Sequence, residues 1–248
     1  MDSISKFNWL SEIYSQYRPT YPESCIDYIF KKDWKGIKIV ADIGAWTWKL
    51  SILFLKRWCK VYAIDPNQEM INQACKDIGE NKLFHPILAS AENTTINNDS
   101  LDLIVVGQAF HWFDRKLFKE ECKKILKNNC YIAILYNNWD KKAEIIKRIN
   151  ELSKQYCPRY KGSSWGLEKQ EELFNNFFSS YEKRVFSNDY HLNLEQFLWL
   201  NFSASYAPRQ WEKNYDTYLN TLTTLFKEFS DWEILSMPNN TILRIGKI

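Results

Sequence analysis

The first half of the chain alternates short apolar runs with amphipathic segments, and this rhythm limits the fold more than any other feature. Five runs rich in branched apolar residues predict strands buried on both faces: 38–43, 60–65, 83–88, 102–106 and 130–136. Apolar residues at helical spacing predict helices between them, at 49–58, 67–78 and 115–126. Strands that alternate with helices in this way predict an α/β fold with a doubly wound, mostly parallel sheet.

The second half of the chain is less regular. Helical spacing predicts helices at 140–156, 167–178, 194–200 and 215–229, and apolar patterning predicts strands at 183–192 and 241–245. No internal repeat, low-complexity tract or Pro/Gly/Ser-rich linker separates these parts. We therefore expect one domain over residues 1–248, in which roughly 140–200 form a substrate-side cap inserted into the sheet.

Polar side chains stand where the predicted strands end. Asp42 and Asp65 end the first two strands, and the segments 90–92 and 108–112 follow the third and fourth. The carboxyl ends of parallel strands meet at one edge, and open α/β sheets bind ligands there, at the topological switch point. The sequence therefore predicts a ligand site at this edge of the sheet.

Charge, cysteine content and hydrophobicity limit the binding partners and the cellular location that we expect. The net charge is +3, from 33 basic and 30 acidic residues without a basic stripe, so we expect no nucleic-acid partner. The six cysteines lack zinc-binding spacing, which predicts reduced thiols and no metal site. The apolar run 101–113 is too short to span a bilayer, and residues 1–5 lack the features of a secretory signal. We expect a cytoplasmic protein with no membrane partner, and the sequence does not indicate its oligomeric state.

The loop after the first predicted strand reads Asp42-Ile-Gly44-Ala45-Trp46-Thr-Trp48. It resembles motif I of the class I S-adenosylmethionine (SAM)-dependent methyltransferases, in which an acidic residue precedes Gly-x-Gly-x-Gly at the start of a helix. Glycines in such loops permit positive φ and let the backbone approach the ligand closely. The resemblance implies a seven-stranded Rossmann-like methyltransferase fold with a helical cap. It also implies that SAM binds at the five numbered positions of this loop: Asp42, Gly44, Ala45, Trp46 and Trp48.

Further segments support the resemblance at the expected distances. It implies that Asp65 binds the ribose hydroxyls of SAM, that Ala91 and Glu92 contact the adenine, and that Gln108 borders the methyl group. His111 is the only histidine near this edge and is a candidate catalytic base. The alternative is that its ring simply packs at the end of the strand.

Two more segments, 14–22 and 203–208, resemble trans-aconitate-methyltransferase-like proteins, within the type 11 methyltransferases. The resemblance implies that the first segment folds over SAM, with Tyr14 and Arg18 closing on the cofactor. A guanidinium suits bidentate contact with the cofactor carboxylate, although Arg18 could instead form an ordinary surface ion pair. Such proteins act mostly on small molecules, so we expect a small-molecule methyl acceptor, for example a carboxylate.

Trp46 and Trp48 depart from the family, because they occupy the second and third glycine positions of the loop. A tryptophan is strained at positive φ. Each indole would also need space that the amino-acid tail and ribose of the cofactor should fill, and overfilling a packed site is unfavourable. We therefore expect this loop to be impaired in the chain as written.

The departure extends beyond the loop and suggests a cause. Glycine occurs 7 times and tryptophan 11 times, whereas average usage gives about 17 glycines. The resemblance leads us to expect glycine at eight tryptophans in all, and reassigning them would raise glycine from 7 to 15 and leave three tryptophans. Our hypothesis is that a codon meaning glycine, most simply UGA under a variant code, has been read as tryptophan. The eight are Trp9, Trp46, Trp48, Trp58, Trp165, Trp199, Trp211 and Trp232, whereas Trp34, Trp112 and Trp139 look native.

Other classes of protein remain as alternatives. A non-catalytic methyltransferase-like binding protein would explain Trp46 and Trp48, but not the scattered changes outside the loop. An RNA methyltransferase is disfavoured by the balanced charge. A nicotinamide-dependent Rossmann enzyme shares the logic of the loop, but the segments 90–92 and 108–114 fit the methyltransferase pattern better.

Overall fold

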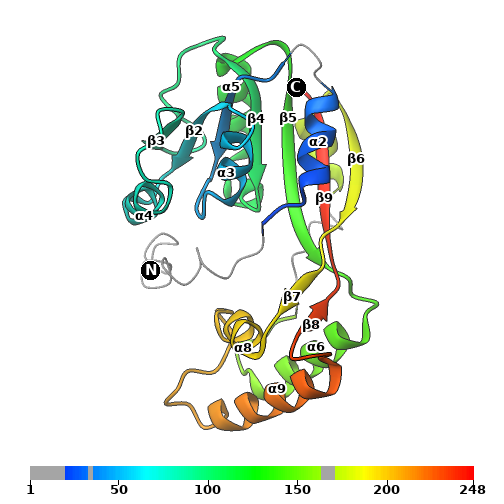
Figure 1. Ribbon diagram of the computed structural model, residues 1–248. Coiled ribbons are helices and arrows are strands. Elements are labelled where there is room, and N and C mark those ends of the chain that lie inside the picture. Colours follow the sequence, from blue (N-terminus) through cyan, green and yellow to red (C-terminus); the bar gives the residue numbers. More distant parts are fainter. Residues whose placement is uncertain (1–19, 33–35, 163–170) are drawn as a thin grey trace.

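The computed structural model describes residues 20–32, 36–162 and 171–248. Within these ranges, seven strands form one sheet in the order β3-β2-β1-β4-β5-β9-β6 (Figure 1). β9 runs antiparallel to both of its neighbours, and the other pairings are parallel. The predicted doubly wound, mostly parallel fold is therefore confirmed. The strands are β1 (Ile39–Ile43), β2 (Lys60–Asp65), β3 (Phe84–Leu88), β4 (Leu101–Gly107), β5 (Leu126–Trp139), β6 (Ser180–Ser187) and β9 (Asn239–Lys247).

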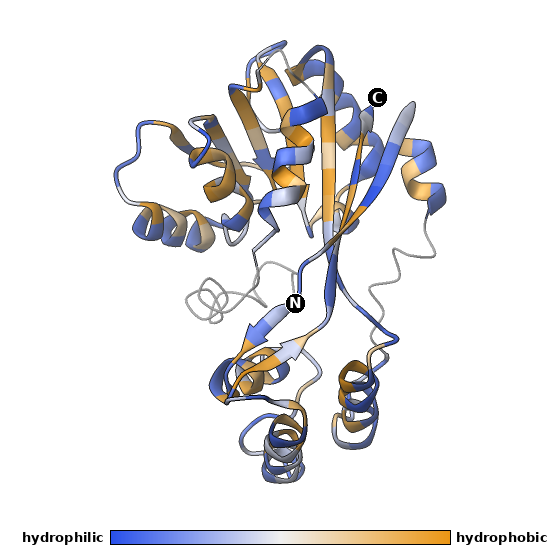
Figure 2. Cartoon of the chain, turned by 45° about the vertical axis from the view of Figure 1, so that its right-hand side comes forward, coloured by the Kyte–Doolittle hydropathy of each residue, from blue (hydrophilic) through white to orange (hydrophobic). Residues whose placement is uncertain are grey.

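Helices cover both faces of the sheet. Successive side chains of a strand point to opposite faces, so the apolar strands present apolar side chains on both faces. Val40 packs with α2 (Glu23–Lys32) and α3 (Lys49–Leu55), whereas its neighbour Ala41 packs on the face covered by α5 (Arg115–Ile125) and α7 (Glu171–Phe177). α4 (Gln68–Ile78) packs beside α3 through a smaller apolar cluster. Figure 2 shows hydrophobic residues concentrated along the strands and on the helix surfaces that meet them.

A second group of elements lies below the sheet in Figure 1. It has its own apolar cluster, whose members include Phe197, Tyr218 and Leu235. The arrangement differs from the expected cap at roughly 140–200, because α7 packs on the main sheet, β6 is one of the strands of that sheet, and α9 belongs to the lower cluster. Alternation could not distinguish a strand of the main sheet from a strand of the cap. The lower elements are α6 (Glu144–Tyr156), β7 (Tyr190–Leu192), α8 (Leu194–Phe202), α9 (Tyr215–Phe229) and β8 (Leu235–Met237).

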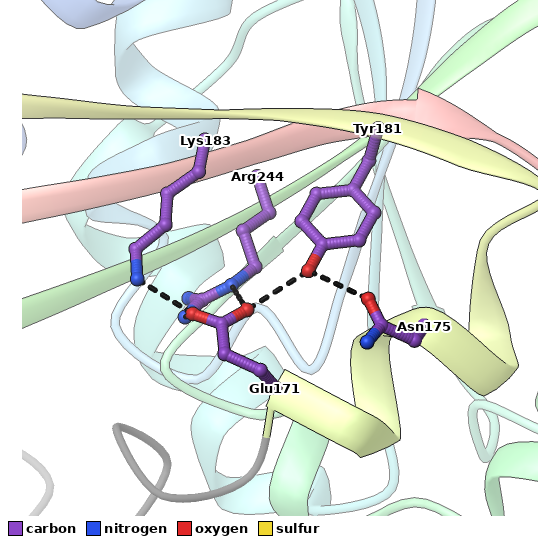
Figure 3. A network of polar contacts seen from close by, with 5 residues as sticks. All are labelled: Glu171, Asn175, Tyr181, Lys183 and Arg244. Atoms are coloured by element: carbon purple, nitrogen blue, oxygen red, sulfur yellow. Dashed lines mark hydrogen bonds and ion pairs between the residues drawn. The ribbon is translucent and has the colours of Figure 1, made fainter.

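A buried cation joins α7 to the β9–β6 edge (Figure 3). Arg244 on β9 is 2% exposed, its guanidinium lies 4.0 Å from the ring centre of Phe174, and its Nη2 lies 2.8 Å from Glu171 Oε1. Glu171 also accepts hydrogen bonds from Lys183 and Tyr181. The hydrogen bond from Arg244, followed by those from Lys183 and Tyr181, lowers the pKa of Glu171 to about 2. A buried arginine needs such a partner, so this pair holds α7 in place.

Candidate functional site

The loop after β1 passes very close to the loop after β4, where the strand order reverses. Gly44 has a φ of 72°, and a Cβ at this position would lie 2.5 Å from the Cβ of Ala109. The amides of Gly44 and Ala45 both donate to the carbonyl of Ile64, at 2.9 and 3.0 Å. A glycine is therefore required at residue 44, both for the left-handed backbone and for the close approach.

Asp42 is a buried carboxylate directly below this loop. It is 1% exposed, and Ser51 Oγ donates to its Oδ2 at 2.6 Å. Among the described residues, its Oδ1 has no hydrogen-bond partner. Burial raises the pKa of Asp42 to about 7, although the hydrogen bonds from Ser51 oppose this shift. An unpaired buried carboxylate oxygen is unfavourable alone and suits a cationic or N–H ligand group.

Asp65 holds the loop against the start of α4. Its Oδ2 accepts the amide of Trp46 and its Oδ1 accepts the amide of Asn67, both at 2.9 Å. Burial raises its pKa and these two hydrogen bonds oppose the rise. The resemblance assigned Asp65 to the ribose, with a helix-capping acid as the alternative, and its contact with the Trp46 amide was not predicted. Each carboxylate oxygen has two acceptor sites, so the ribose contact stays a prediction.

Gln108 stands at the end of β4 in a strained conformation. Its φ is 60°, its amide donates to Leu135 O at 2.9 Å, and its Nε2 donates to Asn137 O at 3.2 Å. A left-handed residue other than glycine is unfavourable, and such residues cluster at ligand sites. The side chain is thereby held between β4 and β5, at the edge where the methyl group was expected.

His111 lies in a short 3-10 helix, η2 (Phe110–Trp112), just beyond β4. Its Nδ1 is 3.4 Å from the hydroxyl of Tyr136 on β5. Burial lowers the pKa of His111 to about 4, so its ring is neutral at pH 7. Burial also raises the pKa of Tyr136. Tyr136 was missed as a site residue because nothing in the apolar pattern of its strand distinguishes it from core.

The segment predicted to contact adenine is joined to the segment after β4. Glu92 Oε1 accepts the amide of Asp114 at 2.9 Å, and Ala91 is buried. Asp114 in turn caps α5 by accepting the amides of Lys116 and Leu117. The structure therefore brings the sequence-predicted residues of four strand ends to one edge. Tyr14 and Arg18 lie outside the described residues.

Two asparagines missed by sequence reasoning hold the chain where it enters this edge. Asn137 and Asn188 donate to the carbonyl of Thr20 at 3.4 and 2.9 Å. The next residue, Tyr21, packs so closely on Gly107 that a Cβ at residue 107 would overlap the tyrosine hydroxyl. Residues 20 and 21 are thus positioned at the carboxyl end of β4. No local signal indicated the asparagines, because their partner is more than a hundred residues away.

The two loop tryptophans differ in environment. Trp48 is 3% exposed and packs with Ala63, Ala74 and Phe84 between β2 and α4. This corrects the expectation that both indoles need the cofactor's space, because the Trp48 indole lies in an apolar cluster behind the loop. Trp46 is half-buried, and its backbone amide is used by Asp65. Both have positive φ, at 30° and 43°.

Within the described ranges, no helix is long and apolar enough to cross a membrane. The same ranges contain no cluster of three histidine, cysteine, aspartate or glutamate residues placed to hold a metal ion.

Comparison with known proteins agrees with this geometry. Residues 41–134 match the family model described as a methyltransferase domain. A Dictyostelium discoideum protein provisionally assigned as a methyltransferase is 33% identical over 129 residues, which are 52% of this chain and 48% of that protein. A Saccharomyces cerevisiae protein provisionally assigned as a SAM-dependent methyltransferase is 26% identical over 196 residues, 73% of this chain and 67% of that protein. The chain thus spans about half the length of the first of these relatives.

The fold is also that of solved methyltransferase-like structures. A structure from Anaeromyxobacter dehalogenans, provisionally assigned as a type II methyltransferase, superposes with a TM-score of 0.73 at 18% identity. The superposition covers 93% of this chain and 98% of that one. The chain therefore contains a methyltransferase domain at residues 41–134, within a fold that it shares with methyltransferase-like structures. This domain contains every sequence-predicted site residue that the structure describes.

Proposed function

We propose that this protein transfers a methyl group from SAM to a small-molecule acceptor. The observation that carries the proposal is Asp42, a buried carboxylate with an unpaired Oδ1 beneath the Gly44 turn. SAM bears an ammonium group and a sulfonium, and both positive charges favour a nearby carboxylate. Asp42 and Gly44 fit this cofactor, whereas residues 46 and 48 carry side chains where the family has none.

The remaining residues would share the work of holding the cofactor. The backbone at Gly44 and Ala45 approaches it, Asp65 accepts from the ribose, and Ala91 and Glu92 border the adenine. Bound SAM supplies an electrophilic methyl group, so little covalent chemistry falls to the protein. Catalysis then depends mainly on orientation, because holding two reactants in line removes a large entropic barrier.

The acceptor decides whether a base is needed. A carboxylate can attack the methyl group without losing a proton, whereas a hydroxyl or amine benefits from a neutral base. A hydrogen bond from the Nδ1–H of His111 to Tyr136 would leave its other ring nitrogen able to take a proton, although burial lowers the His111 pKa to about 4 and so makes the ring a weak base. We assign His111 as that base and Tyr136 as its positioning residue. The six free cysteines suit a reducing compartment such as the cytoplasm.

A second candidate, a binding protein without catalysis, is favoured by the Trp46 side chain and by the strained backbone at residues 46 and 48. Calorimetric titration with SAM tests whether the loop binds the cofactor that methyl transfer requires, using the chain as written and a Trp46→Gly/Trp48→Gly variant. Trp232→Gly is the matched control, because residue 232 lies between α9 and β8, outside the site. We expect SAM binding to appear or strengthen at least tenfold with the loop glycines and to stay unchanged in the control. Absence of binding in every variant would contradict the proposed function.

The charge argument has its own test. A cationic ligand beside Asp42 lowers the pKa of that carboxyl, so binding near pH 6 should release a proton. Titration in two buffers of different ionisation enthalpy measures this release. Release should vanish in Asp42→Asn, which should also bind SAM about tenfold or more weakly, because it loses a charge-assisted contact. Equal proton release by both forms would rule out the role of Asp42.

A further inference from the structure

Among the described residues, four tryptophans have the backbone conformation that proteins normally reserve for glycine. Trp46, Trp48, Trp58 and Trp232 have φ values of 30°, 43°, 61° and 47°. A left-handed backbone brings Cβ too close to the following carbonyl, and glycine alone escapes this contact. Trp112 and Trp139, which looked native in the sequence, do not have positive φ. Trp199 and Trp211, where the resemblance also leads us to expect glycine, do not have positive φ either, so the conformation supports glycine at four positions only.

Trp58 occupies the glycine position of a helix C-terminus. Beyond α3, the amide of Cys59 donates to Phe54 O at 3.2 Å, and the amide of Trp58 donates to Leu55 O at 3.0 Å. These two bonds define a Schellman motif, with residue 58 as the left-handed residue that follows the helix. Cys59 and Phe54, whose positions form the apolar pair that accompanies the motif, belong to the same core cluster. Glycine is the usual residue at this position.

Trp232 occupies a tight turn with the same requirement. Asp231 and Ile234 exchange both of their backbone hydrogen bonds at 2.9 Å, so residues 232 and 233 form a two-residue loop. Both loop residues have positive φ, at 47° and 63°. Turns of this kind favour glycine, asparagine and aspartate. Nothing in the geometry of this turn favours a tryptophan at residue 232.

Packing does not compensate for the strain at these two positions. The exposed fractions of Trp58 and Trp232 are 85% and 92%, so their indoles lie almost wholly in water. Trp139, by contrast, packs edge-on against Tyr190 with ring centres 4.8 Å apart. A strained backbone persists where packing contacts offset its conformational cost, and an indole that is almost fully exposed makes few such contacts.

Trp48 shows the same mismatch at a helix start. It is the N-cap of α3, with φ 43° and ψ 12°, and it makes no side-chain capping bond. An N-cap residue usually has an extended backbone and accepts an amide through a side-chain oxygen. Glycine at 46 and 48 would combine with Gly44 to give three glycines at alternate positions of the cofactor loop.

We infer that the protein made in its source organism carries glycine at residues 46, 48, 58 and 232, where the codon translated as tryptophan is decoded as glycine. At residues 46 and 48 the inference deepens the proposed function, because it restores the loop that approaches SAM. Residues 58 and 232 lie outside that site, so they carry the inference independently. Loss of function in one site would not explain a left-handed tryptophan at a helix end and another in a distant turn.

Peptide mass spectrometry of the protein from its native source tests the inference directly. Trypsin should release residues 39–49, which contain positions 46 and 48, and residues 228–244, which contain position 232. Residues 128–141 form the matched control, because this peptide contains Trp139. We expect glycine masses at positions 46, 48 and 232 and a tryptophan mass at position 139. Tryptophan at positions 46, 48 and 232 would overturn the inference.

The gene provides a second, independent measurement. One codon should stand at positions 46, 48, 58 and 232, and a different codon at positions 112 and 139. The same codon at all six positions would overturn the inference. These results do not depend on SAM: glycine in the native peptides, together with a failure of that native protein to bind SAM, would refute the proposed function and leave this inference standing.

Discussion

Replacing Trp58 with glycine should stabilise the protein, although the substitution removes a large apolar side chain. A left-handed conformation costs a residue with a Cβ about 1–2 kcal/mol, and glycine avoids this. Glycine also gives the unfolded chain more freedom, which offsets about 0.5–1 kcal/mol of the gain. The indole is 85% exposed, so its removal sacrifices little buried area. We expect a net gain of about 0.5–1 kcal/mol.

Thermal and urea unfolding measure this gain. For a chain of this size, the expected change raises the melting temperature by roughly 1–4 °C. The urea midpoint should rise with an unchanged slope, because the exposed surface on unfolding hardly changes. The matched control is Trp58→Ala, which removes the indole but keeps Cβ and so should not gain stability. A Trp58→Gly protein no more stable than Trp58→Ala would refute the steric reasoning.

Three further predictions concern buried charge and the site. Burial raises the folded-state pKa of Asp42 to about 7, so the stability of the parent should fall as pH rises from about 4 to about 7. In urea unfolding, Asp42→Asn should therefore be roughly 2–4 kcal/mol more stable than the parent at pH 8 and nearly equal at pH 4. Glu171→Gln leaves the buried Arg244 without its carboxylate and should lower stability by about 2 kcal/mol, a value reduced because Glu171 is partly exposed to solvent. The pKa of Glu171 is lowered to about 2, so its contribution should be present at pH 7 and disappear as pH falls from about 4.5 to 2, measured by acid unfolding of both forms. Tyr136→Phe should slow methyl transfer to a hydroxyl or amine acceptor about tenfold and shift its pH profile, yet leave a carboxylate acceptor unaffected; equal slowing of both acceptor classes would exclude a positioning role.

The sheet, and the edge proposed to bind the cofactor, could be predicted from local patterns. Branched apolar runs predicted β1, β2, β4 and β5, because strands of a parallel sheet are buried on both faces. Asp42 and Asp65 were located at strand ends by their place in those runs. The carboxyl ends of parallel strands share an edge in any doubly wound sheet, so the position of the site followed from the order of elements.

Contacts between residues that are distant in the sequence could not be predicted from local patterns. Arg244 interrupts an apolar strand, and its burial makes sense only beside Glu171, more than seventy residues earlier. The same holds for Asn137, Asn188 and the carbonyl of Thr20.

The sequence by itself indicated the α/β class, the loop proposed to bind the cofactor and the anomaly of its tryptophans, since each is a pattern within a few neighbouring residues. The tertiary structure decided the membership of the lower cluster, the loop-holding role of Asp65 and the left-handed backbone at Trp58 and Trp232. The physical reason is that periodicity reports which face of an element is buried, whereas contacts and turn conformations depend on how distant segments pack together.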